Sequence, residues 1–186
     1  MKIKEEVERI LRVSDLMVTS HIIMSNKYKF RAIVAEVSLF TCSALLCAIV
    51  FADETLLIKY FTVDYKLYIG IFSLLTFIYS FLVSKFNWPV KSIEHKIAFK
   101  SFVGFKLRSK TMLKQIDDLS KEEVILFLNQ YRLVTSELIP IPEKEFVKCK
   151  KHHKEKVYIS KLLDTRPGTI IILSRIKLWW RDNCTK

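Results

Sequence analysis

Two long uncharged segments dominate the pattern of hydrophobic and polar positions along the chain. The first runs from 37 to 52, and counting back to Ala32 gives 21 residues with Glu36 as the one charged position. The second runs from 67 to 84 without a formal charge. As helices these segments would be about 31 Å and about 27 Å long, close to the hydrocarbon thickness of a bilayer. Neither has the charged stripe of an amphipathic helix.

This pattern predicts an all-α membrane protein with two transmembrane helices and a helical cytoplasmic domain. The alternative for the two segments is a pair of buried helices in a soluble bundle. The distribution of basic residues predicts the orientation: Lys and Arg number seven in 1–31, two in 53–66 and twenty-two in 85–186. Because cytoplasmic flanks are enriched in Lys and Arg, we expect both termini to lie in the cytoplasm.

The same counts divide the chain into three regions. They are a cytoplasmic N-terminal helix (1–31), a transmembrane hairpin (32–84) with an outer loop (53–66), and a basic cytoplasmic helical region (85–186).

Helical signals continue in the region after the hairpin. A helix is expected from about 90 to 114, and Ser120 with Glu123 makes the capping box of an amphipathic helix that ends before Pro140. A very basic helix is expected over 143–163, followed by a break at 164–168. Strand signals are weak everywhere.

The formal net charge of +12 favours an anionic partner, either nucleic acid or an acidic membrane surface. Only three glycines occur, too few for a phosphate-binding loop of the Walker or Rossmann type. The four cysteines are interpreted as reduced thiols.

The basic helix supplies a candidate anion or partner surface. Its residues are Lys148, Lys151, His152, Lys154 and Lys156. This surface is interpreted either as a solvated face beside an acidic leaflet or as a binding surface for a nucleotide ligand.

Three tryptophans are candidate membrane-interface anchors: Trp88, Trp179 and Trp180. The last two share a helical face with aliphatic residues, as in a helix that lies in the membrane interface. Packing against the other cytoplasmic helices explains that face equally well.

Cys149, His152 and His153 form a Cys-x-x-His-His cluster, a combination that suits zinc when four ligands converge. No second Cys or His pair has matching spacing, and no oxyanion-hole or glycine-turn pattern accompanies a nucleophile. We therefore expect no metal site, no cofactor and no enzymatic activity.

Polar residues inside the apolar segments are candidates for a pore lining. They are Glu36, Ser43, Ser73, Thr76 and Ser80. In the alternative interpretation the carboxylate pairs with Lys29 or Arg31 near the interface, and the hydroxyls bond to their own i−4 carbonyls. Two helices cannot enclose an aqueous lumen, so conduction would require a homo-oligomer.

The layout resembles the SLATT family, two-transmembrane effector domains associated with SMODS nucleotidyltransferases and SLOG sensors. The resemblance rests on a basic lead-in (NKYKFRAI) to the first apolar segment, a short hairpin, and the stretch KCKKHHKEKVYISKLLDTRPGTIIILSRIKLWW. It implies an anti-phage defence effector that oligomerises and permeabilises or depolarises the inner membrane, causing growth arrest or cell death. The implied activator is a cyclic nucleotide or other nucleotide signal, or the product of a neighbouring defence gene.

Two other functions remain open from the residues alone. One is a non-conducting membrane anchor or scaffold that recruits an acidic protein or a nucleic-acid complex through its basic helices. The other is a soluble basic helical protein that binds nucleic acid.

Overall fold

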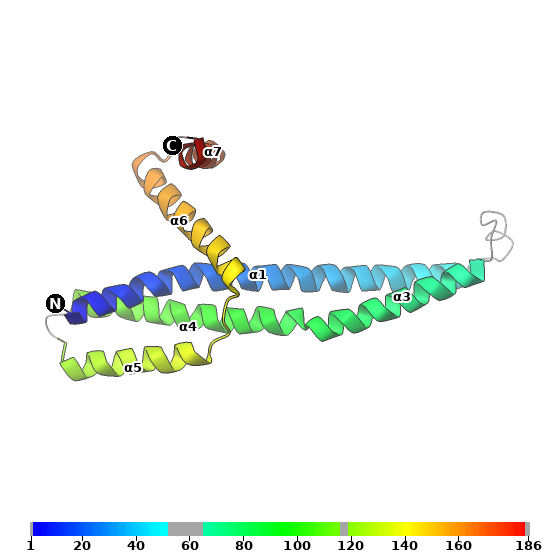
Figure 1. The fold of residues 1–186 in the computed structure, drawn as a ribbon, viewed down its shortest axis with the longest axis horizontal. Coiled ribbons are helices and arrows are strands. Elements are labelled where there is room, and N and C mark those ends of the chain that lie inside the picture. Colours follow the sequence, from blue (N-terminus) through cyan, green and yellow to red (C-terminus); the bar gives the residue numbers. More distant parts are fainter. Residues whose placement is uncertain (1, 52–64, 116–118, 185–186) are drawn as a thin grey trace. The chain divides into compact units, whose positions relative to one another are not determined.

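The computed structural model describes residues 2–51, 65–115 and 119–184 of the chain (Figure 1). The described residues form helices and no strands, which confirms the all-α prediction. The helices are α1 (Lys2–Val50), α3 (Tyr65–Phe86), α4 (Trp88–Lys114), α5 (Lys121–Glu137), α6 (Glu143–Thr165) and α7 (Ile171–Cys184). Most of the expected outer loop, 53–66, lies outside the described residues.

The chain folds as two compact units. Unit 1 combines Met1–Met24 with His95–Lys186, and unit 2 is Ser25–Glu94. Unit 2 is longer at both ends than the hairpin 32–84 that the charge pattern delimits. Reciprocal hydrogen bonds lie at this end of unit 2: the Ser25 hydroxyl donates to the Ser92 carbonyl and the Ser92 hydroxyl donates to the Ser25 carbonyl, each at 2.9 Å.

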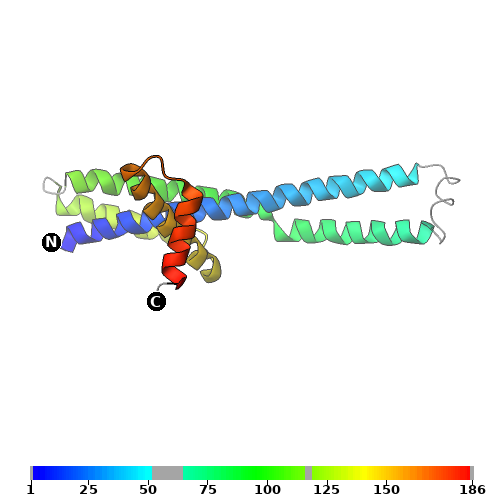
Figure 2. The ribbon, with the colours of Figure 1, turned by 90° about the horizontal axis from the view of Figure 1, so that it is seen from above.

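Unit 2 is a helical hairpin in which α3 runs antiparallel to the second half of α1 (Figures 1 and 2). A hydrogen bond of 3.0 Å between the Ser38 and Tyr79 hydroxyls joins the two helices. We call the apolar parts of these helices, residues 32–50 and 66–84, the apolar hairpin.

A single residue separates α3 from α4. Asn87 has φ 49°, in the left-handed region that asparagine tolerates better than most residues. Its carbonyl accepts from the Lys91 amide at 3.3 Å, so α4 begins at Trp88 and not at about 90 as expected. The Trp88 ring stacks on Phe86 across this break, with ring centroids 5.3 Å apart.

The core of unit 1 lies between the first part of α1, α4 and α5, which run side by side (Figures 1 and 2). Its buried residues are Val7, Ile10, Met112, Val124 and Phe127. Phe105 adds edge-to-face contacts with Phe127 and Tyr131. The predicted capping box at Ser120 and Glu123 is confirmed, with the Glu123 amide donating to the Ser120 hydroxyl at 3.2 Å.

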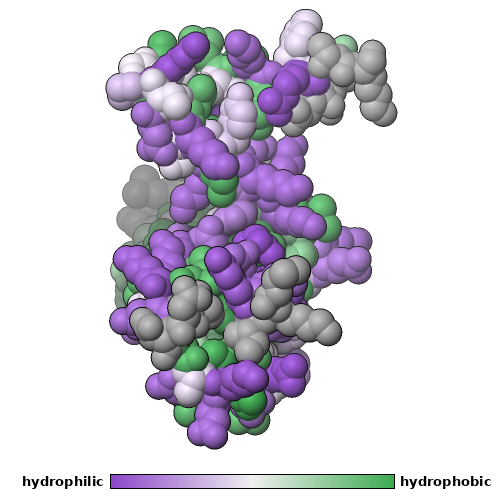
Figure 3. All heavy atoms as spheres, turned by 90° about the vertical axis from the view of Figure 1, so that its left-hand side faces the viewer, coloured by the Kyte–Doolittle hydropathy of each residue, from purple (hydrophilic) through white to green (hydrophobic). Residues whose placement is uncertain are grey.

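Helix α6 begins directly after Pro142 and continues two residues beyond the expected end, to Thr165. It buries Cys149 and Ile159 within unit 1, and α7 packs against it. Hydrophilic side chains predominate on the face of unit 1 seen in Figure 3, with smaller hydrophobic areas between them.

Candidate membrane-spanning hairpin and basic surface

The apolar hairpin carries large hydrophobic side chains that are exposed. Phe40 and Phe77 are 77% and 71% exposed, and many other large hydrophobic side chains on both helices are at least 36% exposed. Each helix contains an 18-residue stretch apolar enough to cross a membrane, and only 6% and 0% of these stretches are buried. The core helix of a soluble protein would be mostly buried, so this exposure disfavours the soluble-bundle alternative. The structure thus contains two helices long and apolar enough to span a bilayer.

The candidate pore-lining residues lie on different parts of the two helices. Glu36 and Ser43 are exposed on α1, as are Ser73 and Ser80 on α3. Thr76 is half-buried, and its hydroxyl donates to the Phe72 carbonyl at 2.9 Å. That bond is the i−4 backbone pairing expected if the hydroxyls do not line a pore. The exposed side chains of Glu36, Ser43, Ser73 and Ser80 leave a pore-lining role open.

Sequence reasoning missed the interhelical Ser38–Tyr79 bond, because a hydroxyl pair gives no periodic signal. It also missed a small pocket of about 190 Å³ in unit 2. Arg31, Tyr79 and Trp88 line this pocket together with apolar residues of α1. A cation, a phenol and an indole so close together are typical of the polar end of a membrane hairpin.

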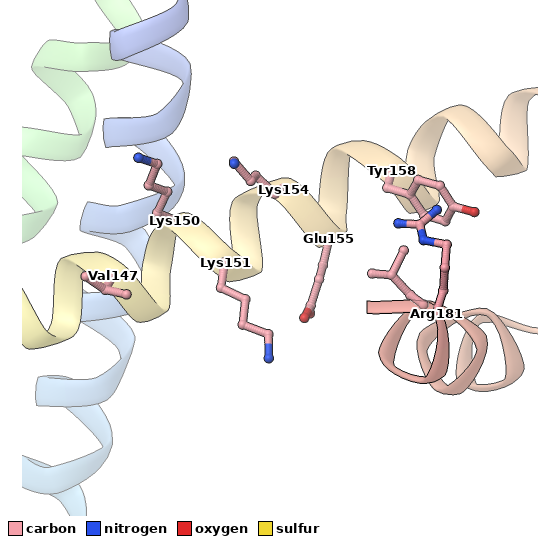
Figure 4. Close-up of a pocket in the computed structure, with 8 residues that line it drawn as sticks. Val147, Lys150, Lys151, Lys154, Glu155, Tyr158 and Arg181 are labelled. Atoms are coloured by element: carbon pink, nitrogen blue, oxygen red, sulfur yellow. The ribbon is translucent and has the colours of Figure 1, made fainter. Parts of the chain in front are cut away.

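An open pocket of about 410 Å³ lies between the basic helix α6 and helix α7 (Figure 4). Its lining residues are Val147, Lys150, Lys151, Lys154, Glu155, Tyr158, Leu178 and Arg181. We call it the α6–α7 pocket. Tyr158 and Arg181 point toward each other from the two helices, with the guanidinium carbon 5.4 Å from the ring centre. This geometry is a cation–π contact.

The pocket includes only part of the predicted anion surface. Lys151 and Lys154 line it, but His152 and Lys156 are exposed elsewhere on α6. Lys148 instead forms a 3.4 Å ion pair with Glu145. The cationic and aromatic pocket residues that the prediction missed are Lys150, Tyr158 and Arg181. Arg181 could not have been found from the basic run, because it comes from the next helix.

The candidate anchors Trp179 and Trp180 are 55% and 61% exposed on α7. Packing against the other helices of unit 1 therefore leaves more than half of each side chain accessible. Trp88 lies at the start of α4, in unit 2.

Polar side chains also join α1, α4 and α6 inside unit 1. His153 Nδ1 lies 2.9 Å from the Thr19 hydroxyl, and His153 Nε2 lies 3.7 Å from an Asp15 carboxylate oxygen. The other oxygen of Asp15 accepts from Lys106. Although the order of hydroxyl, imidazole and carboxylate is that of a hydrolytic triad, Thr19 is 5% exposed and lies within a helix. The arrangement fits a helix-docking contact.

Deeper in unit 1, His21 and His95 form a buried pair. Their Nδ1 atoms are 2.9 Å apart, and the His21 ring stacks on Phe102 with centroids 5.4 Å apart. Burial, and secondarily the charge of His95, lowers the pKa of His21 to about 4. His21 is therefore neutral at physiological pH, and a hydrogen bond joins the two Nδ1 atoms.

The structure separates the members of the Cys-x-x-His-His cluster. Cys149 is buried with its thiol 4.0 Å from the Ser20 carbonyl, His153 faces Thr19, and His152 is exposed. Among the described residues, no three His, Cys, Asp or Glu side chains are grouped closely enough to hold a metal ion.

No protein-family model matches the chain, and no curated protein or solved structure is significantly similar to it. The described arrangement offers an apolar hairpin suited to a bilayer and a basic surface suited to anions.

Proposed function

We propose that this chain is a two-pass protein of the bacterial inner membrane, with both termini in the cytoplasm. The supporting observation is the apolar hairpin, whose membrane-length stretches are 6% and 0% buried. The Lys and Arg counts in the three flanking regions support the orientation. In this arrangement unit 1, with its basic helices, is the cytoplasmic part.

We further propose that the protein is a defence effector that oligomerises on activation and permeabilises or depolarises the membrane. A lumen needs several copies, because two helices cannot enclose one. The proposed lining consists of the exposed side chains of Glu36, Ser43, Ser73 and Ser80 and the half-buried side chain of Thr76. A nucleotide signal or a neighbouring gene product would bring the protomers together by favouring the assembled state. The resemblance to SLATT effectors supports this role.

The second candidate is a non-conducting anchor that recruits an acidic partner. The Thr76 hydroxyl bond to its own backbone favours it, since that hydroxyl needs no water-filled lumen.

Ion leakage from proteoliposomes separates the two functions. The purified chain would be reconstituted at increasing protein-to-lipid ratios around an ion-sensitive dye, with empty vesicles as the control. An oligomeric pore predicts leakage that rises more steeply than the first power of the protein content. Insertion confirmed by carbonate washing, without leakage from vesicles in which cross-linking shows that the chain is oligomeric, would favour the anchor.

A further inference from the structure

Helix α7 presents an apolar stripe on the side away from α6. Ser174 is buried and Leu178 lines the pocket, so these residues mark the side that packs on α6. At 100° per residue, the other side collects an aliphatic and aromatic stripe about 120° wide. Its members are 55–70% exposed: Ile172, Leu173, Ile176, Trp179 and Trp180. Arg175 and Lys177 flank the stripe.

On the side of α7 that faces α6, the α6–α7 pocket combines positive charge with apolar surface. Four cations line it, Lys150, Lys151, Lys154 and Arg181, and Glu155 is the one acid among the described lining residues. Figure 4 shows Lys150 and Lys154 extending on one side of α6, and Lys151 on the other. Val147, Leu178 and the Tyr158 ring supply the apolar part of the lining.

An occupant must match both features at once. A nucleic acid or an acidic protein would neutralise the lysines, but it would leave the aliphatic stripe of α7 in water. An anionic phospholipid leaflet satisfies both, because phosphate groups lie directly above acyl chains and interfacial tryptophans are stabilised between them.

We propose that α6 and α7 form a lipid-binding arm for anionic phospholipid. The stripe of α7 lies among the upper acyl chains, and the α6–α7 pocket holds a headgroup phosphate. The arm rests on the proposed membrane location of the chain, and it adds a second, peripheral contact with the bilayer beyond the two spanning helices.

Tryptophan emission of the full chain in nanodiscs tests the arm. The chain has three tryptophans, so a Trp88→Phe variant leaves Trp179 and Trp180 as the only reporters. We expect a blue shift, and quenching by acyl-brominated lipid, when phosphatidylcholine discs are replaced by discs with about one third phosphatidylglycerol. The two kinds of disc have the same acyl chains and differ in the headgroup, which carries a net negative charge only in phosphatidylglycerol.

Charge substitutions locate the phosphate site. Replacing the three lining lysines, Lys150, Lys151 and Lys154, by Gln should abolish the phosphatidylglycerol-dependent part of the shift. The matched control removes three charges from the same helix outside the pocket, at Lys144, Lys156 and Lys161, and should retain most of it. If both variants lose the phosphatidylglycerol-dependent shift equally, the pocket is not a phosphate site, because only the total charge of α6 then matters.

Two other outcomes would overturn the proposal. Emission that is the same in neutral and anionic discs would mean that α7 does not enter the interface. A shift produced in phosphatidylcholine discs by millimolar inorganic phosphate or glycerol phosphate would mean that the site takes soluble phosphates. If the chain fails to incorporate into nanodiscs at all, the proposed membrane location fails, which is a separate result from an unresponsive arm.

Discussion

Acidification should destabilise unit 1 through His21. This side chain is 2% exposed, its Nδ1 lies 2.9 Å from that of His95, and Phe102 covers its ring. Protonation would place a charge in this buried position. If both histidines carried protons on Nδ1, two donors would face each other, and the hydrogen bond between the rings would be lost.

The sign and size of the effect follow from the pKa of His21, which is lowered from 6.5 to about 4. The unfolded chain binds the proton more readily, so folding stability is fully present above pH 6.5 and falls as the pH drops toward 4. Integrating this single titration between pH 7.5 and pH 5 gives a loss of about 2 kcal/mol in the free energy of unfolding.

Urea unfolding of the full chain in detergent micelles, followed by circular dichroism at both pH values, measures this loss. A His21→Gln variant keeps a polar side chain without the titration, so its stability should change much less between the two pH values. His152→Gln on the exposed face of α6 is the matched control and should behave like the parent. Equal losses of stability in the parent and in the His21→Gln variant would mean that His21 is not the source of the pH dependence.

Three further substitutions probe the hairpin and the core. Thr76→Leu should abolish leakage if the hydroxyl faces a lumen. Thr41→Leu, which removes an equivalent i−4 bond on α1, should leave leakage unchanged. Equal leakage in the two variants would contradict a pore-lining position for Thr76. Glu36→Gln should alter the reversal potential in planar bilayers, and identical potentials would remove Glu36 from the lining. The Ser109 hydroxyl is buried without a hydrogen-bond partner in the described structure, so Ser109→Ala should raise the free energy of unfolding by about 1 kcal/mol. The control Ser20→Ala loses a bonded hydroxyl and should not raise it. A Ser109→Ala variant that is destabilised in urea unfolding would contradict this prediction.

The helices of this chain could be predicted because their signals are local. Uncharged runs define the apolar hairpin, and the capping box at Ser120 fixes the start of α5 within one residue. The proline at 142 likewise marks where α6 begins. Each of these signals depends on neighbours within a few positions.

The contacts between helices could not be predicted in this way. His21 and His95 are 74 positions apart, and Thr19 and His153 are 134 apart, so no periodicity links them. The Ser25 hydroxyl likewise donates to the Ser92 carbonyl, 67 positions away. The basic run suggested an anion surface, but only packing of α7 on α6 adds Arg181 to Lys151 and Lys154.

The proposed membrane function depends most on the insertion and orientation of the apolar hairpin. Single cysteines would be introduced at Lys59, in the expected outer loop, and at Lys114, at the end of α4, in a chain whose four native cysteines are replaced by serine. A membrane-impermeant maleimide would then be applied to intact spheroplasts, and carbonate-washed membranes would be analysed. We predict labelling at position 59 and none at position 114 until the cells are lysed. Labelling of both positions in intact spheroplasts, labelling of 114 alone, or recovery of the protein in the soluble fraction would contradict the account.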